Sequence, residues 1–136
     1  MRVIFLDIDG TLNSVRSMRQ HGRSRPFDPE AVEAFNRLIR STGARIVVSS
    51  TWRIGPLVQR GARAAVEHMA EILRLEAIEG EVVGCTPRLE REIGGFVLAR
   101  PRRDEIRAWL DAHPEVTAWV VLDDDNDAGP ENLIHC

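Results

Sequence analysis

The chain of 136 residues is 43% hydrophobic and 29% charged, which is typical of one folded domain and excludes a disordered tail. Its net charge of −3 and its aromatic content of 5%, with no Tyr, disfavour a single-strand nucleic-acid binder built on aromatic stacking. The N-terminal apolar run is too short for a signal peptide, no run is long enough to span a membrane, and two cysteines form no disulfide framework. We therefore expect a single cytoplasmic domain over residues 1–136 that does not bind membranes.

The first predicted elements are a buried strand and a capped helix. Residues 2–6 read Arg-Val-Ile-Phe-Leu, an apolar run that is typical of a strand buried on both faces of a parallel sheet. Residues 10–27 are rich in Gly, Ser and Arg, which indicates an irregular loop. Asp28-Pro29-Glu30 predicts a helix start, because the acid can cap the helix and Pro suits its first position, and Gly43 predicts the helix end.

Strands and helices alternate through the rest of the chain. The predicted elements are a strand at 45–49, a helix at about 57–76, a short strand at 82–83, a helix at about 102–112, a strand at 118–122 and the start of a strand at 133–134. Residues 84–101 contain two Pro and three Gly and predict a loop, with a brief extended piece at 96–98. This alternation predicts an α/β fold, a doubly wound parallel sheet between two helix layers. Because the chain ends at Cys136, we expect the last strand to leave a sheet edge for a partner or further chain to cover.

Polar side chains follow three of the predicted strands at the points where they end. Asp7 and Asp9 follow the first strand, Ser49-Ser50-Thr51 follow the second, and Asp123 and Asp124 follow a later one. Active sites of such sheets lie at the carboxyl ends of the strands, so we expect these side chains to converge. Converging carboxylates repel one another unless a cation lies among them, and a set of oxygen ligands suits Mg²⁺. The sequence therefore predicts a magnesium site that attracts phosphate oxygens.

These strand ends resemble the motifs of the haloacid-dehalogenase (HAD) superfamily. Its first motif is similar to Phe5-Leu6-Asp7-Ile8-Asp9-Gly10-Thr11-Leu12, its second to Ile46-Val47-Val48-Ser49, and its fourth to Val120-Val121-Leu122-Asp123-Asp124. Three further runs look closest to a compact subgroup that resembles the HAD domain of bacterial RNA-repair (Swiss Army Knife) proteins: Ser-Ser-Thr-Trp-Arg from Ser49, Leu-Asp-Asp-Asp from Leu122, and Glu-Ile-x-x-Trp-Leu from Glu105. The resemblance implies a Rossmann-like HAD core without a folded cap domain, since the segments 11–28 and 84–101 are too short for one.

The resemblance also implies the chemistry of the first two motifs. Asp7 would attack phosphorus and form an aspartyl-phosphate, which divides one difficult displacement into two. Asp9 would protonate the leaving oxygen and then deprotonate the attacking water. Ser49 would donate a hydrogen bond to the phosphoryl group. The other residues that we expect to contact the substrate are Gly10, Thr11, Ser50, Arg53 and Arg103.

The metal ligands implied by the resemblance come from the first and fourth motifs. Mg²⁺ would be held by Asp7, by the backbone carbonyl of Asp9, and by Asp123 or Asp124, with Asp127 contributing through a water molecule. A plain acidic turn is the alternative reading of residues 123–127.

The third motif of the family is normally a Lys near the start of a helix, but every one of the 18 basic residues here is Arg. The cation of the third motif must therefore be Arg100, Arg102 or Arg103. Arg102 is favoured because Ile106 follows it by four residues, as an apolar residue often does in the family. This cation would neutralise charge on Asp7 and on the phosphoryl oxygens.

A site without a cap would be open, which favours a large phosphorylated substrate such as a nucleic-acid end. The arginines of the segment 16–25 would then grip a phosphate backbone, although such a loop is more often simply solvated. Alternatively, a partner subunit supplies a lid. The predicted function is Mg²⁺-dependent phosphomonoester hydrolysis, and the alternatives are phosphotransfer to another acceptor and a non-catalytic domain that binds phosphate or a partner. A nucleotide, a phosphoprotein and a small metabolite also remain open as substrates.

Overall fold

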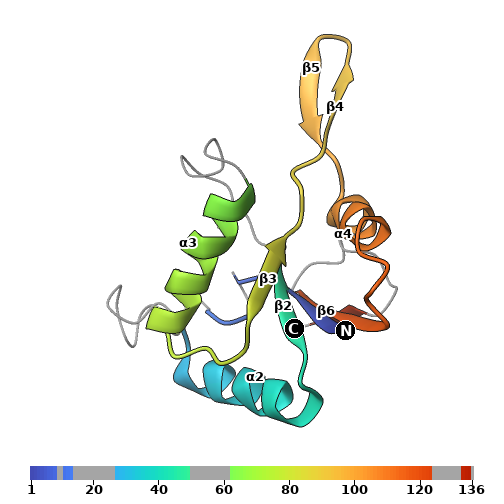
Figure 1. The fold of residues 1–136 in the computed structure, drawn as a ribbon. Helices are drawn as coiled ribbons and strands as arrows, with labels where there is room; N and C mark the ends of the chain where they lie inside the picture. The colour runs from blue at the N-terminus through green and yellow to red at the C-terminus, as the bar shows by residue number, and fades with distance from the viewer. Residues whose placement is uncertain (9–10, 14–26, 50–61, 124–132, 136) are drawn as a thin grey trace.

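The fold comes from a computed structural model that describes residues 1–8, 11–13, 27–49, 62–123 and 133–135. The described elements, in chain order, are β1 (Arg2–Leu6), α2 (Pro29–Thr42), β2 (Arg45–Val48), α3 (Ala62–Leu75), β3 (Val82–Cys85), β4 (Glu90–Ile93), β5 (Phe96–Ala99), α4 (Arg102–Asp111), β6 (Ala118–Asp123) and β7 (Leu133–His135) (Figure 1). Among these residues, no helix is long and apolar enough to cross a membrane.

The main sheet has five parallel strands in the order β3-β2-β1-β6-β7. The central strand is β1, where Phe5 pairs with Val47 of β2 on one side and with Val121 of β6 on the other. Strand order reverses on either side of β1, as in a doubly wound fold. The predicted parallel α/β architecture is confirmed, including the short strands predicted at 82–83 and 133–134, which the structure extends to 82–85 and 133–135.

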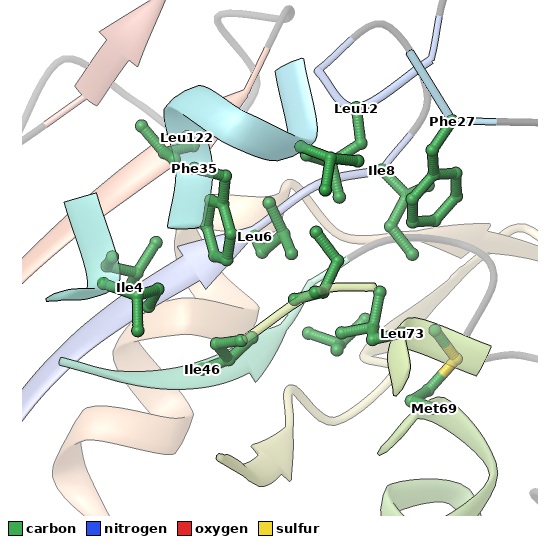
Figure 2. Close-up of a cluster of buried hydrophobic side chains, with 14 of the residues drawn as sticks. Ile4, Leu6, Ile8, Leu12, Phe27, Phe35, Ile46, Met69, Leu73 and Leu122 are labelled. Atoms are coloured by element: carbon green, nitrogen blue, oxygen red, sulfur yellow. The ribbon is translucent and has the colours of Figure 1, made fainter. Parts of the chain in front are cut away.

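Alternate residues of β1 face two separate helix layers. Ile4 and Leu6 pack into a core with α2 and α3, where Phe35, Met69 and Leu73 are buried (Figure 2). On the other face, Val3 and Phe5 pack into a second core together with Ile106 and Trp109 of α4. The sheet is therefore covered on both faces, which explains why residues 3–6 of β1 are all apolar.

The predicted start and end of α2 are confirmed. Asp28 is extended and its side chain accepts a hydrogen bond from the Glu30 backbone N–H at 3.0 Å, with Pro29 at the first helical position. Gly43 adopts the left-handed conformation, with φ of 64°, and its N–H donates to the Ile39 carbonyl. The predicted helix at 57–76 is α3, of which the structure describes Ala62–Leu75.

The layer formed by α4 contacts the sheet through Trp109. Its ring packs edge-on against Phe5, with 5.6 Å between ring centroids, and stacks on His113. A Cβ atom at Gly84 of β3 would lie 2.7 Å from Trp109 Nε1, so only glycine permits this approach. Cys85, which follows Gly84, is the last residue of β3.

The prediction of a loop over residues 84–101 is wrong, except for the extended piece predicted at 96–98, which lies in β5. Residue 85 ends β3, and β4 and β5 form a two-stranded antiparallel ribbon with Ile93 opposite Phe96. Gly94 and Gly95 join the two strands, with φ of 56° and 83°, as a tight hairpin turn requires. Figure 1 shows the ribbon projecting beyond the main sheet, from the end toward which β3 points. Among the described residues, this ribbon is the whole insertion between β3 and α4, and no folded cap domain is present.

Candidate active site

Three predicted site residues meet at the carboxyl edge of the sheet. The Asp7 backbone N–H, directly after β1, donates to the Leu122 carbonyl at 3.0 Å, and the Ser49 N–H donates to the Leu6 carbonyl at 2.9 Å. Asp123 is the last residue of β6. These bonds continue the parallel ladder one residue beyond each strand, so Asp7 is fixed between the ends of β2 and β6.

The side chain of Arg102 contacts both carboxylates of this group. Arg102 Nη1 lies 2.9 Å from Asp7 Oδ1 and 2.8 Å from Asp123 Oδ2, where it donates a hydrogen bond. Arg102 is the first residue of α4, and its side chain is only 19% exposed. One guanidinium nitrogen therefore links the ends of β1 and β6 to the start of α4.

The other two arginines proposed for the third motif lie elsewhere. Arg100 pairs with Asp104 through its Nε atom at 3.2 Å. Arg103 is exposed and lies 4.0 Å from Asp104. Of the three candidates, the structure places only Arg102 against Asp7.

The position of Arg102 opposes the usual preference for charge along a helix. Cations are disfavoured in the first turn, where the backbone N–H groups carry partial positive charge, whereas Asp104 and Glu105 in the same turn are favoured. Local rules of this kind are most often broken at functional sites. The two buried carboxylates that Arg102 contacts compensate for this cost.

The protonation of Arg102 follows from its surroundings. Burial lowers the pKa of its guanidinium, but the charges of Asp7 and Asp123 and their hydrogen bonds outweigh this effect and raise the pKa above its ordinary value. Arg102 therefore stays cationic at neutral and moderately alkaline pH. Asp7 and Asp123 are both buried, and a shared cation offsets part of the cost of burying them.

The turn after Asp7 is anchored in the core. The N–H groups of Thr11 and Leu12 both donate to the Ile8 carbonyl, at 3.1 and 2.9 Å. The side chains of Ile8 and Leu12 are buried in the core next to Phe27, as Figure 2 shows. Ile8, Thr11 and Leu12 are therefore held in place directly after Asp7. The hydroxyl of Thr11 is buried and has no hydrogen-bond partner among the residues that the structure describes.

Several predicted site residues lie outside the described residues. They are Asp9, Gly10, Ser50, Arg53, Asp124, Asp127 and the arginines of the segment 16–25. The structure therefore brings together Asp7, Ser49, Asp123 and Arg102 from the predicted set, and places Arg103 away from them.

The carboxylates at the described part of the site are of a type that binds Mg²⁺. Asp7 and Asp123 offer carboxylate oxygens, the ligands that this hard cation prefers. Their two negative charges and the positive charge of Arg102 leave a net charge of −1, which a phosphate dianion would not approach without a further cation. Within the described ranges, no group of three or more His, Cys, Asp or Glu side chains is placed to hold a metal. The other predicted ligands, Asp9, Asp124 and Asp127, belong to the segments outside those ranges.

Two residues next to the site were not identified from the sequence. Glu105 is buried in the first turn of α4 and accepts a hydrogen bond from the Leu89 N–H at 2.9 Å, which ties the base of the ribbon to α4. Thr86 is buried after β3, and its N–H donates to the Val48 carbonyl at 3.0 Å. Acidic residues are common in the first turn of a helix, so the sequence does not show that Glu105 is buried and bonded to the Leu89 backbone.

This arrangement can present an ionised carboxylate, held by a permanent cation, at the open edge of a parallel sheet. Such a group can act as a nucleophile, and the same guanidinium can stabilise negative charge on a neighbouring phosphoryl group.

Comparison with known protein families gives a match over nearly the whole chain. The model of the family described as "HAD domain in Swiss Army Knife RNA repair proteins" matches residues 3–136. No curated protein and no solved structure matches the chain significantly. The matched family suggests a hydrolase of the phosphatase type.

Proposed function

Because the chain belongs to the family of HAD domains in Swiss Army Knife RNA repair proteins, we propose that it is a Mg²⁺-dependent phosphomonoesterase that acts on phosphorylated nucleic-acid ends. The contact of Arg102 Nη1 with both Asp7 and Asp123 carries the proposal. It supports a carboxylate nucleophile with an adjacent cation, which is the arrangement that phosphoryl transfer requires.

In the proposed first step, a carboxylate oxygen of Asp7 attacks the phosphorus atom of the substrate. A bond forms between Asp7 and phosphorus while the ester bond to the leaving oxygen breaks, and Asp9 gives its proton to that oxygen. The leaving alcohol, the dephosphorylated end of the substrate, then departs. The fixed backbone of Asp7 and its contact with Arg102 support this role, because both orient the carboxylate before the substrate arrives.

In the proposed second step, a water molecule attacks the phosphorus atom of the aspartyl-phosphate. Asp9, now ionised, accepts the proton of this water, the bond between Asp7 and phosphorus breaks, and inorganic phosphate leaves. Both residues return to their starting states. The hydrogen bonds from Thr11 and Leu12 to the Ile8 carbonyl support the role of Asp9, because they hold the residues on either side of it close to Asp7 in the chain.

Arg102 has two roles in this proposal. It keeps Asp7 ionised and oriented, and it stabilises the negative charge that is spread over the phosphoryl oxygens in the transition state. Ser49 and Thr11 would contribute hydroxyl donors to the same oxygens. The buried Thr11 hydroxyl supports this, because a phosphoryl oxygen would supply a hydrogen-bond acceptor for it.

Mg²⁺, when bound by Asp7, Asp123 or Asp124 and the carbonyl of Asp9, supplies the positive charge that lets an anionic phosphoryl group approach an anionic nucleophile. The net charge of −1 on Asp7, Asp123 and Arg102 supports the need for that charge.

A nucleic-acid end is the proposed substrate for two reasons. The matched family takes its description from RNA-repair proteins. The segment 16–25 carries four arginines and no acid, a composition that favours contact with a phosphate backbone.

The proposal is tested by measuring phosphate release from an aryl phosphate, nucleotides, and oligonucleotides phosphorylated at the 3′ or the 5′ end, with Mg²⁺ and with chelator. We expect metal-dependent release that is fastest from an oligonucleotide and absent in Asp7→Asn. Binding of a phosphorylated end without release would favour the non-catalytic alternative. Transfer of the phosphoryl group to an added alcohol in preference to water would identify a phosphotransferase.

A further inference from the structure

The ribbon of β4 and β5 concentrates exposed apolar side chains. Ile93, Phe96, Val97 and Leu98 are 48%, 73%, 62% and 46% exposed, and they are four of the six large exposed apolar residues within the described ranges. An isolated two-stranded ribbon is at best marginally stable in water. A patch of this kind on a projecting element is typical of a protein–protein contact.

The two faces of the ribbon differ. Residues that pair across an antiparallel ladder lie on the same face, so Ile93 and Phe96 share one face with Leu98, whose partner is Arg91. The opposite face carries Val97 beside Glu92. One face is therefore mainly apolar, and the other is mixed.

The outer edge of β5 offers backbone groups for another strand. The Arg100 N–H donates to the Leu89 carbonyl at 2.9 Å, just below the last ladder pair. Leu89 and Arg100 therefore form a hydrogen-bonded pair. Hydrogen-bonded and non-hydrogen-bonded pairs alternate along an antiparallel ladder, so the third pair beyond it, Glu92 with Val97, is not hydrogen-bonded. The N–H and C=O groups of Val97 therefore point outward from β5, and those of Glu92 point outward from β4.

The edge of β5 lacks the usual protection against pairing. Phe96–Ala99 contains no charged residue and no proline, the two features that most often block an exposed edge. The base of the ribbon is tied to α4 by the hydrogen bond from the Leu89 N–H to Glu105, so one end of the ribbon is anchored. A binding element that is already ordered loses less conformational entropy when it pairs.

The backbone groups and the charges of the ribbon indicate what kind of partner it can bind. Alternating outward N–H and C=O groups are satisfied best by another extended strand. The charges of the ribbon cancel, with Arg88 paired to Glu90 at 3.0 Å and Arg91 beside Glu92 in the sequence, so neither a phosphate backbone nor a basic partner is favoured. An antiparallel pair of identical strands is self-complementary about a twofold axis.

We propose that β5 of one chain pairs antiparallel with β5 of a second copy, which joins two ribbons into one four-stranded sheet. The apolar faces of the two ribbons then lie on the same side of this sheet and form one continuous patch around Phe96 and Leu98. Strands of four residues bury less area than a standard stable interface, so the dimer forms and dissociates with protein concentration. This inference is independent of the phosphatase activity.

Sedimentation equilibrium of the whole chain over a range of concentrations tests the inference. The weight-average mass of the wild type should rise from 15.3 kDa toward twice that value. Val97→Pro removes one outward N–H of β5, that of residue 97, while it keeps the hydrogen bonds within the ribbon. We expect the dimer dissociation constant of this variant to rise on the order of thirtyfold, since each copy loses one hydrogen bond.

Glu92→Pro is the matched control, because it removes the equivalent outward N–H from β4 and should leave dimerisation unchanged. Val97→Lys and Glu92→Lys repeat the comparison with a charge on the edge strand, and circular dichroism checks that each variant is folded. A wild type that stays monomeric at every concentration would overturn the inference, as would equal dimerisation of Val97→Pro and Glu92→Pro. A monomeric wild type whose oligonucleotide binding is lost in Val97→Pro would also overturn it, and would assign the ribbon to nucleic acid.

Discussion

Arg102 Nη1 lies 2.9 Å from Asp7 Oδ1, and this contact joins the first residue of α4 to the residue that follows the central strand. The same nitrogen lies 2.8 Å from Asp123 Oδ2. The orientation of Asp7 is therefore set by the folded protein before any substrate binds. Preorganisation of this kind supplies much of the rate enhancement in many enzymes.

Replacing Arg102 tests the importance of this contact. Arg102→Met removes the cation that Asp7 and Asp123 share, so we expect a loss of stability of about 3 kcal/mol. Phosphate release should fall on the order of a hundredfold or more, because the same cation stabilises the transition state. Denaturant unfolding and steady-state kinetics measure the two effects.

Arg103→Met is the control for this experiment. Arg103 is exposed and lies one residue away on the same helix, so its replacement should change stability by less than about 0.5 kcal/mol. Equal losses in the two variants would mean that the contact with Asp7 has no special role.

The binding of Mg²⁺ is predicted to stabilise the folded protein. A metal that binds only the folded state raises the midpoint of thermal unfolding as its concentration increases. Asp123→Asn should reduce this increase, because it removes a buried carboxylate at the site. Asp111→Asn, an exposed residue at the end of α4, should leave the increase unchanged. Identical responses of both variants to Mg²⁺ would place the metal elsewhere.

The pH dependence follows from the raised pKa of Arg102. The pKa of Arg102 is higher in the folded protein than in the unfolded chain. The stability that such a basic group contributes is fully present at any pH below its ordinary pKa. It is lost only as the pH rises through the pKa of the folded state. The contact with Asp7 therefore contributes a constant amount at neutral and moderately alkaline pH. Arg102→Lys introduces a group with an ordinary pKa of about 10.4, so its activity should decline at a lower alkaline pH than that of the wild type. Superimposable alkaline limbs of the two pH–rate profiles would argue against a cationic role.

Gly84 is predicted to be essential for the packing of α4. In Gly84→Ala the new Cβ would lie 2.7 Å from Trp109 Nε1, so Trp109 or β3 must move, at a cost of about 1–3 kcal/mol. The smaller ring in Trp109→Phe should recover part of this cost in the double variant, and a double-mutant cycle by urea unfolding measures the coupling. Additive losses would show that Gly84 and Trp109 do not constrain each other.

The fold was predictable because its signals are local. The apolar run at residues 3–6 of β1 predicted a buried strand, and Asp28 and Gly43 predicted the two ends of α2. The rule that sites lie at the carboxyl ends of parallel strands then predicted that Asp7 and Asp123 would lie close together, as they do through Arg102.

The ribbon was missed because its sequence signals conflict. Residues 90–93 read Glu-Arg-Glu-Ile, which has little β propensity, while the Gly94-Gly95 turn signal stood among other loop-forming residues. The choice among Arg100, Arg102 and Arg103 also depended on tertiary structure. Which arginine reaches Asp7 is determined by the direction in which α4 leaves the ribbon, and the tether of Leu89 to Glu105 has no signature in the sequence.

The central claim is that Asp7 becomes phosphorylated during turnover, and rapid acid quenching tests it most directly. The protein is mixed with Mg²⁺ and a phosphorylated oligonucleotide, quenched within one turnover, digested and analysed by mass spectrometry. We predict a phosphoryl group on the peptide that contains Asp7, and none on this peptide in Asp7→Asn. Full phosphate release in which the Asp7 peptide never carries a phosphoryl group would contradict the account, and would mean that water attacks the substrate directly.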